Sequence, residues 1–371
     1  MGDLVNRITR KNQDLVSELP LTISAQYGLI DQNEFFDKRV ASKDVSGYYL
    51  IENGEFAYNK STSTDAPWGA IKRLDRYENG VLSTLYIVFG IKENNLVDSD
   101  FLVSYYSTNL WHKGIHESAA EGARNHGLLN IAPADFFETK LMIPQDIEEQ
   151  KKIGKYFEEL DHLITLHQRK CDQTKNLKKY MLQKMFPQNG AKVPEIRFDG
   201  YTYDWEQRKL GDIVQEFKSG SSLKADRISE NGEYPVYGGN GLRGYTSTYN
   251  HEGDFALIGR QGALCGNMNY SIGKAYFTEH AVIVEADEEN NTRFIYYVLD
   301  TMNLGQYSDQ SAQPGLAVNK LIKLENMFPR KGEQIKIGAY FSTLDHLITL
   351  HQRKLEKLKK IKKAMLEKMF V

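Results

Sequence analysis

The chain contains 371 residues, of which 47 are basic and 49 acidic, so its formal net charge at pH 7 is −2. Its hydrophobic residues, 41% of the chain, suffice for globular cores and exclude a disordered polypeptide. Two cysteines, Cys171 and Cys265, cannot build a disulfide framework or a cysteine-rich metal site. Residues 82–91 are too short to cross a membrane, and residues 1–7 lack the apolar core of a signal peptide. We therefore expect a soluble, cytoplasmic protein with roughly two or three domains.

Residues 1–149 are predicted to form a mixed α and β domain. Strand-forming residues run from Ser83 to Phe89, and a helix is expected near Asp100–Thr108. Several basic or amide side chains stand beside glycines and asparagines, in loops from which they could reach base edges in a DNA groove. Solvated surface is the plainer interpretation of any one of them. The candidates are Lys38, Arg39, Lys43, Asn59, Lys60, Ser61, Lys72 and Arg73.

Residues 150–187 are predicted to form one long helix. Apolar residues recur in alternating steps of four and three, which is the spacing of a coiled-coil seam. No proline falls between Gln150 and Phe186, and about 33 residues would give a rod of roughly 50 Å. The seam predicts that Phe157, Leu160, Ile164 and His167 contact a second helix. A helix stop and linker follow at Pro187–Gly190.

Residues 188–333 are predicted to form a second mixed domain with its linker. Strand-forming residues occupy Ala281–Val284, and a helix is expected near Thr292–Met302. The segment Gly239–Gly244 has the glycine spacing of a dinucleotide-binding loop, but a Tyr-Thr-Ser-Thr-Tyr run follows it, which favours a hairpin. The loop residues that could contact DNA here are Lys224, Arg227, Asn240, Arg243, Arg260 and Gln261.

Residues 334–371 repeat the first long helix. Gln334–Phe370 matches Gln150–Phe186 at an offset of 184, with 25 of 37 positions identical by direct count. The predicted pairing residues of the second copy are Phe341, Leu344, Ile348, His351, Leu355 and Leu358. We therefore expect an α+β protein in which two mixed domains are separated by two long helices. These would pair with each other as a coiled coil, so the chain would carry an internal repeat.

Charge is distributed unevenly between these parts. Residues 150–187 hold nine basic and four acidic side chains, and residues 334–371 hold nine and three, so the helices carry +11 and the remainder −13. A lysine-coated helix in solvent explains this distribution. A positive surface facing a phosphate backbone or an acidic partner explains it as well, and the sequence leaves both open.

The sequence contains no recognisable catalytic or metal centre. No phosphate-binding loop occurs, and the absence of any Pro-Pro pair argues against an adenine methyltransferase. The seam histidines His167 and His351 could bind a metal ion, but a polar position that sets helix register is the favoured interpretation. His112, His116 and His280 lack further ligands at metal spacing. We therefore predict no catalytic residue and no metal ligand.

The order of variable and repeated parts resembles the specificity subunit of type I restriction–modification systems. In the first half, Pro20–Tyr27 and Ala57–Ser61 look like a different recognition-domain subtype of that family. The other segments that carry the resemblance are Trp205–Asp212, Tyr237–Gly241, Gly259–Gly262, Phe277–His280, Gln306–Gln310 and the identical Leu160–Lys170 and Leu344–Lys354.

The resemblance implies a division of labour. Each mixed domain would be a target recognition domain that reads one half of a bipartite, asymmetric DNA site. The helices would pair as an antiparallel coiled coil with a pseudo-two-fold internal repeat. They would set the spacing and dock two methylation subunits, with restriction and motor subunits in the full complex. The chain would be non-catalytic and carry no cofactor, whereas partner subunits would use S-adenosylmethionine, ATP and Mg²⁺. Double-stranded DNA would be its ligand, and it would have no membrane partner.

Two other functions stay open for this sequence, and the chain departs from the family pattern in one respect. The chain could be an adaptor with two ligand-binding heads and no DNA recognition, or, less favoured, a standalone DNA enzyme. The second half has a preface, Pro194–Leu210, before its Gly-Asp pair, whereas the first half starts at Met1-Gly2-Asp3 without one. Either the N-terminus is shortened or this segment is dispensable in the first subtype.

Overall fold

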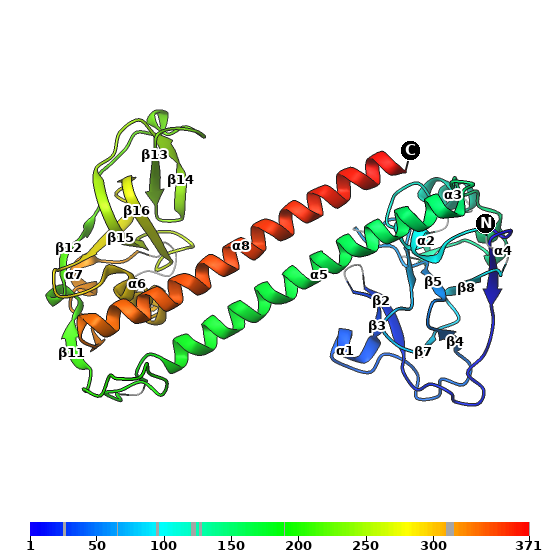
Figure 1. Cartoon of the computed structure of the whole chain (residues 1–371), viewed down its shortest axis with the longest axis horizontal. Coiled ribbons are helices and arrows are strands. Elements are labelled where there is room, and N and C mark those ends of the chain that lie inside the picture. The colour runs from blue at the N-terminus through cyan, green and yellow to red at the C-terminus, as the bar shows by residue number, and fades with distance from the viewer. Residues whose placement is uncertain are drawn as a thin grey trace. The chain divides into compact units, whose positions relative to one another are not determined.

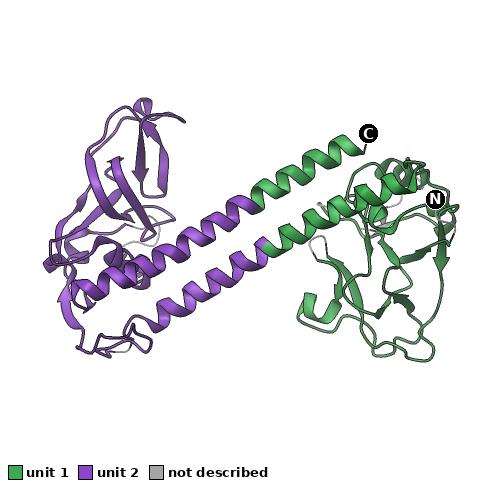
Figure 2. Ribbon diagram, viewed as in Figure 1, with its two compact units in different colours: residues 1–166, 355–371 green, residues 167–354 purple. Residues whose placement is uncertain are grey.

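The structure is a computed structural model and describes residues 1–24, 27–64, 66–93, 96–119, 124–125, 128–188, 190–308 and 315–370. The last two residues of the Gln306–Gln310 segment therefore lie outside the described residues. The chain forms two compact units, of which unit 1 comprises Met1–Leu166 with Leu355–Val371 and unit 2 comprises His167–Lys354 (Figure 2). Among the described residues, no helix is long and apolar enough to span a membrane.

Unit 1 combines short strands with short helices and the ends of both long helices (Figure 1). Its largest sheet has the order β1-β8-β5-β6 and is antiparallel throughout. The elements before the first long helix are β1 (Val5–Ile8), β2 (Leu21–Ser24), β3 (Gly28–Asp31), α1 (Gln32–Phe36), β4 (Tyr49–Glu52), β5 (Phe56–Asn59), β6 (Ala70–Arg73), β7 (Asn79–Leu82), β8 (Ile87–Ile91), α2 (Ser99–Tyr105), α3 (His112–Ser118), β9 (Arg124–Asn125), β10 (Leu128–Leu129) and α4 (Pro133–Glu138).

Unit 2 is built on a six-stranded sheet of order β12-β17-β15-β16-β13-β14. All its pairings are antiparallel except β13 with β16. The elements between the long helices are β11 (Glu206–Lys209), η1 (Leu210–Asp212), β12 (Val214–Ser219), η2 (Ala225–Arg227), β13 (Tyr234–Gly238), β14 (Gly241–Thr246), β15 (His251–Gly259), β16 (Met268–Phe277), β17 (Ala281–Ala286), α6 (Thr292–Thr301), η3 (Leu304–Tyr307), α7 (Val318–Leu321) and β18 (Glu325–Phe328).

Four strands of each sheet follow one order with the same antiparallel pairing. Strand β8 lies between β1 and β5 in unit 1, and β17 lies between β12 and β15 in unit 2. In each unit an N-capped helix follows the sheet, α2 capped by Asp98 and α6 capped by Asn291. Each cap side chain accepts a hydrogen bond from the backbone N–H three residues on, which satisfies one of the free donors of the first turn. The two modules are therefore structural equivalents despite their divergent sequences.

The long helices are α5 (Ile147–Lys184) and α8 (Lys331–Met369), each beginning three residues before its repeat. Contacts fix their direction within each unit. In unit 1 the Phe157 ring packs against Phe370 and Asp161 pairs with Lys362. In unit 2 His167 contacts His351 and Lys178 pairs with Asp345. Residue numbers rise along one helix as they fall along the other, so the pairing is antiparallel. The expected α+β fold with two paired long helices is confirmed.

Two local predictions have different outcomes. The single strand expected from Ser83 to Phe89 is wrong, because Ser83–Tyr86 forms a turn closed by the Tyr86 N–H on the Ser83 carbonyl, and β8 begins only at Ile87. The turn lets the chain pass from β7, which pairs with β4, to β8 in the other sheet. The hairpin predicted around Gly239–Gly244 is confirmed as the antiparallel pair of β13 and β14.

Candidate nucleic-acid interface

In unit 2, three loops meet at the end of strand β15. A Cβ atom added at Gly259 would lie 2.3 Å from the Gly239 carbonyl oxygen, so glycine allows these two loops to touch. The third loop joins them through His280, whose Nδ1 lies 3.1 Å from Gln261 Oε1 and whose carbonyl accepts the Arg260 N–H. The strand ends therefore gather separate sequence segments into one surface.

This surface carries polar side chains that could read DNA bases. Asn240 and Arg243 are exposed on the β13–β14 hairpin, Gln261 is exposed, and Arg260 is half-buried after β15. Arginine, glutamine and asparagine can each make paired hydrogen bonds to a base edge. His280 belongs to the same surface but was interpreted as isolated in the sequence analysis. Its place in the Phe277–His280 segment was the available clue.

The first unit has a related loop after strand β5. Asn59 ends β5, and Lys60 and Ser61 follow it as Arg260 and Gln261 follow β15. The two strands occupy corresponding places in their sheets. Asn59 Oδ1 accepts the Ser61 N–H, while its Nδ2 donates to Tyr86 OH, so this amide holds the loop in shape. Lys60 is half-buried and Ser61 is exposed.

The remaining exposed candidates lie in other loops. Lys38, Arg39 and Lys43 follow helix α1, and Arg39 donates hydrogen bonds to the carbonyls of Ala41, Ser42 and Lys43, which orders this basic loop. Lys224 precedes the short η2 helix and Arg227 ends it, with Arg227 Nη2 3.3 Å from Thr248 Oγ1.

Lys72 and Arg73 are turned toward the protein itself. Arg73 donates to Asp75, Ser99 and Asp100, and so ties β6 to the start of α2. Burial, together with the charge of Lys362, lowers the pKa of the Lys72 ammonium group. The structure therefore commits Arg73 to protein partners and partly buries Lys72 near Lys362 and Asp161, although sequence alone placed both with the exposed candidates.

The two copies of the helix repeat contact each other at the two seam histidines. His167 Nδ1 and His351 Nδ1 lie 3.0 Å apart, a distance at which one ring can donate to the other when both are neutral. Desolvation lowers the pKa of His167, and the charges of His351, Lys354 and Lys170 lower it further. The described residues contain no group of three or more His, Cys, Asp or Glu side chains that could hold a metal ion.

Equivalent ion pairs lie on either side of this contact. Lys362 Nζ is 2.6 Å from Asp161 Oδ1 in unit 1, and Lys178 Nζ is 2.6 Å from Asp345 Oδ1 in unit 2. Both members of one pair differ from those of the other by the repeat offset of 184 residues. Asp345 also accepts a hydrogen bond from the hydroxyl of buried Tyr297, at 2.7 Å.

The predicted pairing residues differ in burial. Phe157, Leu160, Phe341, Leu344 and Leu355 are buried, whereas the other five are half-buried. Those five are Ile164, His167, Ile348, His351 and Leu358. The buried phenylalanines belong to the cores of units 1 and 2, so part of the seam anchors the modules.

Each long helix also holds a module through a buried glutamine. Gln150 accepts the Asp98 N–H and donates to the carbonyls of Leu96 and Pro144. Gln334 accepts the Asn291 N–H and donates to Asn290 and Pro329. Both glutamines begin the strong repeat, but their position in it does not by itself predict these buried hydrogen bonds.

A helix pair that carries two modules of one topology, each with polar loops at corresponding strand ends, defines a two-headed recognition protein. The family described as the type I restriction modification DNA specificity domain matches residues 42–176 and 203–360. The chain therefore belongs to the family of type I restriction–modification specificity subunits, which are the non-catalytic specificity components of these systems.

Curated relatives carry the same description. The type I restriction enzyme EcoprrI specificity subunit of Escherichia coli is 44% identical over 151 residues, which cover 39% of this chain and 37% of that protein. A putative type I restriction enzyme specificity subunit of Haemophilus influenzae is 27% identical, covering 43% and 42% of the two chains. The chain thus matches less than half the length of each of these two relatives.

Longer matches are more distant. The type I restriction enzyme MjaVIII specificity subunit of Methanocaldococcus jannaschii is 23% identical over 78% of this chain and 73% of its own. The crystal structure of the type I restriction–modification S subunit from M. genitalium superposes with a TM-score of 0.70 at 18% identity. That match covers 100% of this chain and 94% of the other, and it supports the fold.

Proposed function

We propose that this chain selects a bipartite, asymmetric DNA site, with each module reading one half. The observation that carries the proposal is that two modules with corresponding strands each present a polar loop at the same strand end. These loops are Asn59–Ser61 in unit 1 and Arg260–Gln261 in unit 2. Their sequences differ, so two related scaffolds present different side chains to the two half-sites. This arrangement would make the target asymmetric.

The helices would supply the constant part of the system. Nearly identical seams, with proline-free repeats and matched ion pairs, support a role in fixing the spacing of the two modules. In this proposal the same helices dock two methylation subunits, and restriction and motor subunits join the full complex. S-adenosylmethionine, ATP and Mg²⁺ would serve those partners, and this chain would contribute recognition alone.

Single substitutions in the two loops test the division between half-sites. Arg260→Ala should relax base preference in one half-site, and Lys60→Ala in the other, each by about 1–3 kcal/mol for a lost base contact. Selection from a randomised duplex library by the assembled complex measures both half-sites together. Matched controls are Lys113→Ala on α3 and Lys209→Ala on β11, both of which remove exposed lysines outside these loops.

The outcomes separate two-module reading from other uses of the loops. Loss of preference confined to one half-site for each loop variant supports the proposal. Unchanged binding and preference would reject these two contacts, whereas an equal loss at every sequence would identify phosphate contacts. A protein with no sequence preference and little salt dependence would instead be the adaptor considered from the sequence.

A further inference from the structure

The two loops proposed to read DNA are each held by a residue that precedes the neighbouring strand. These reading loops are Asn59–Ser61 in unit 1 and Arg260–Gln261 in unit 2. Strand β8 pairs with β5 in unit 1, and β17 pairs with β15 in unit 2. Tyr86 stands immediately before β8, and His280 immediately before β17. Both modules therefore place a polar ring beside the reading loop, at the same point of their strand order.

In unit 2 the ring of His280 fixes the orientation of the Gln261 amide. His280 Nδ1 lies 3.1 Å from Gln261 Oε1, and because a carbonyl oxygen only accepts, the ring donates from this nitrogen. The NH2 group of Gln261 is thereby turned away from the ring. On the other side of the ring, Glu279 Oε1 lies 3.5 Å from His280 Nε2. Turning the amide over would exchange its donor and acceptor, and with them the base edge that it matches.

The backbone of the same loop is held as well. The Arg260 N–H donates to the His280 carbonyl at 2.9 Å, and the Arg260 carbonyl accepts the Leu316 N–H at 2.9 Å. The Cys265 thiol lies 3.3 Å from that carbonyl oxygen. Since the backbone is fixed at Arg260, the remaining freedom of the loop lies in its side chains. The contact between His280 and Gln261 takes that freedom from the amide.

In unit 1 the hydroxyl of Tyr86 fixes Asn59. Asn59 Nδ2 donates to the Tyr86 hydroxyl at 3.3 Å, and Asn59 Oδ1 accepts the Ser61 N–H at 3.0 Å. The second bond closes a turn that has Lys60 at its apex. The Tyr86 ring packs against a buried core cluster of unit 1, which anchors the hydroxyl. The loop therefore offers Lys60 from its apex, while Asn59 and Tyr86 hold its shape.

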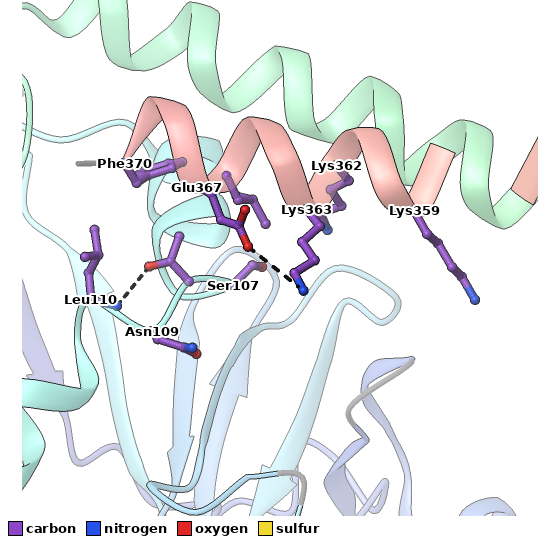
Figure 3. Close-up of a pocket in the computed structure, with 10 residues that line it drawn as sticks. Ser107, Asn109, Leu110, Lys359, Lys362, Lys363, Glu367 and Phe370 are labelled. Atoms are coloured by element: carbon purple, nitrogen blue, oxygen red, sulfur yellow. Dashed lines mark hydrogen bonds and ion pairs between the residues drawn. The ribbon is translucent and has the colours of Figure 1, made fainter. Parts of the chain in front are cut away.

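The residues that hold the loop of unit 1 do not line the cavity drawn in Figure 3. That cavity has a volume of about 500 Å³ and lies between the Ser107–Leu110 segment and α8, where Lys363 and Glu367 form an ion pair. A substitution at Tyr86 therefore alters the reading loop and leaves this surface of the long helix unchanged. Its effect on DNA selection can then be measured apart from any function of the helices.

We propose that Tyr86 and His280 are positioning residues that set the base preference of the two half-sites through the loops they hold. The inference rests on the proposed function and names what fixes its reading loops. A side chain whose donor and acceptor are held in place matches one base edge, whereas a loose one can turn to match several. Discrimination, the ratio of affinities for the preferred and the next base, should therefore fall when either hydrogen bond is removed.

Tyr86→Phe tests the contact in unit 1, because it removes the hydroxyl and keeps the ring. Tyr77→Phe is the matched control, since this hydroxyl lies against the same core cluster and accepts the Asp31 N–H at 3.3 Å, outside the reading loop. The assay is selection from a randomised duplex library by the assembled complex. Tyr86→Phe should lower discrimination by about five-fold in one half-site only, as expected for one hydrogen bond. The control should keep the wild-type preference in both half-sites.

Two substitutions of His280 separate positioning from a structural role. His280→Ala removes the contact with Gln261 and should lower discrimination by about five-fold in the other half-site. His280→Asn restores a polar group near the place of Nδ1 and should recover most of the preference. Affinity for non-specific duplex and the urea midpoint should stay close to wild type in both. A merely structural role would lower affinity for every sequence and would not be rescued by asparagine alone.

Other results overturn the inference in distinguishable ways. Unchanged discrimination in Tyr86→Phe and His280→Ala, beside a wild type that prefers both half-sites, would exclude the positioning role and leave the proposed function standing. A new base preference in His280→Asn would make His280 itself a base-contacting residue. An equal loss of affinity at every sequence would assign these side chains to phosphate contacts or to folding. A wild-type complex without half-site preference would overturn this inference and the proposed function together.

Discussion

Removing the Gln150 amide should loosen the attachment of α2 to the first long helix. Its side chain is fully buried and accepts the Asp98 N–H at 2.9 Å. It donates to the Leu96 carbonyl at 3.2 Å and to the Pro144 carbonyl at 2.8 Å. Gln150→Ala removes all three bonds at once, and alanine cannot replace any of them.

The expected cost follows from these contacts. A hydrogen bond contributes about 1 kcal/mol net, and three together contribute about 3 kcal/mol. Alanine recovers a few tenths of a kcal/mol through its higher helix propensity. We therefore expect the free energy of unfolding of unit 1 to fall by about 2–4 kcal/mol, with faster amide exchange across Asp98–Tyr105.

Urea unfolding combined with hydrogen exchange measured by mass spectrometry checks this prediction. Gln334→Ala is the matched variant, because it removes three equivalent bonds in unit 2 and should accelerate exchange across Asn291–Thr301 instead. Gln173→Ala, an exposed change on the same helix, should stay within about 0.5 kcal/mol. A loss below 0.5 kcal/mol for Gln150→Ala would refute the reasoning.

Three further predictions concern the long helices. Gly154→Ala should destabilise unit 1 by about 2 kcal/mol, because its Cβ would lie 2.6 Å from the Phe101 nitrogen. Gly338→Ala should cost less, because the nearest neighbour of its Cβ would be 3.1 Å away. Equal urea midpoints for the two variants would contradict this prediction. Asp345→Asn should lower the free energy of unfolding by about 1.5–3 kcal/mol, and Asp161→Asn by no more than about 1 kcal/mol. The difference is expected because Asp345 accepts a hydrogen bond from Tyr297 in addition to its ion pair, whereas Asp161 pairs with Lys362. Thermal melts that reverse this order would exclude the shared role of Asp345. The lowered pKa of His167 means that the unfolded chain takes up a proton first, so stability is lost as the pH falls from about 6.5 through the folded pKa. Changing His167 and His351 to leucine should flatten that part of the pH–stability curve, and an unchanged slope would place its origin elsewhere.

The helix repeat could be predicted from sequence because its features are local. The seam spacing, the absence of proline and the constant offset of 184 together predicted two long helices that pair with each other, and the family resemblance implied their antiparallel direction. The same pattern could not predict burial at the ends. Met185 is 2% exposed and Met369 is 37% exposed, although they occupy equivalent positions. The modules packed around them differ, and only the tertiary structure contains that difference.

The candidate interface was harder to predict. Lys60 and Arg260 could be chosen from the sequence because each is a loop residue beside a predicted strand. Arg73 shows the same local pattern, but its side chain donates hydrogen bonds to Asp75 and Asp100. Sequence spacing also could not bring His280 to Gln261, because their contact depends on two strands ending together. Side chains that gather through sheet topology need the fold before they can be grouped.

Methylation sequencing of host DNA, with the gene intact and deleted, tests the central claim most directly. The account predicts a split, asymmetric adenine-methylated motif that disappears on deletion and returns when the gene is restored. Its two halves should change separately when the loops after β5 and β15 are altered. A methylation pattern unaffected by deletion, in cells that express this chain and an active methylation subunit, would contradict the claim.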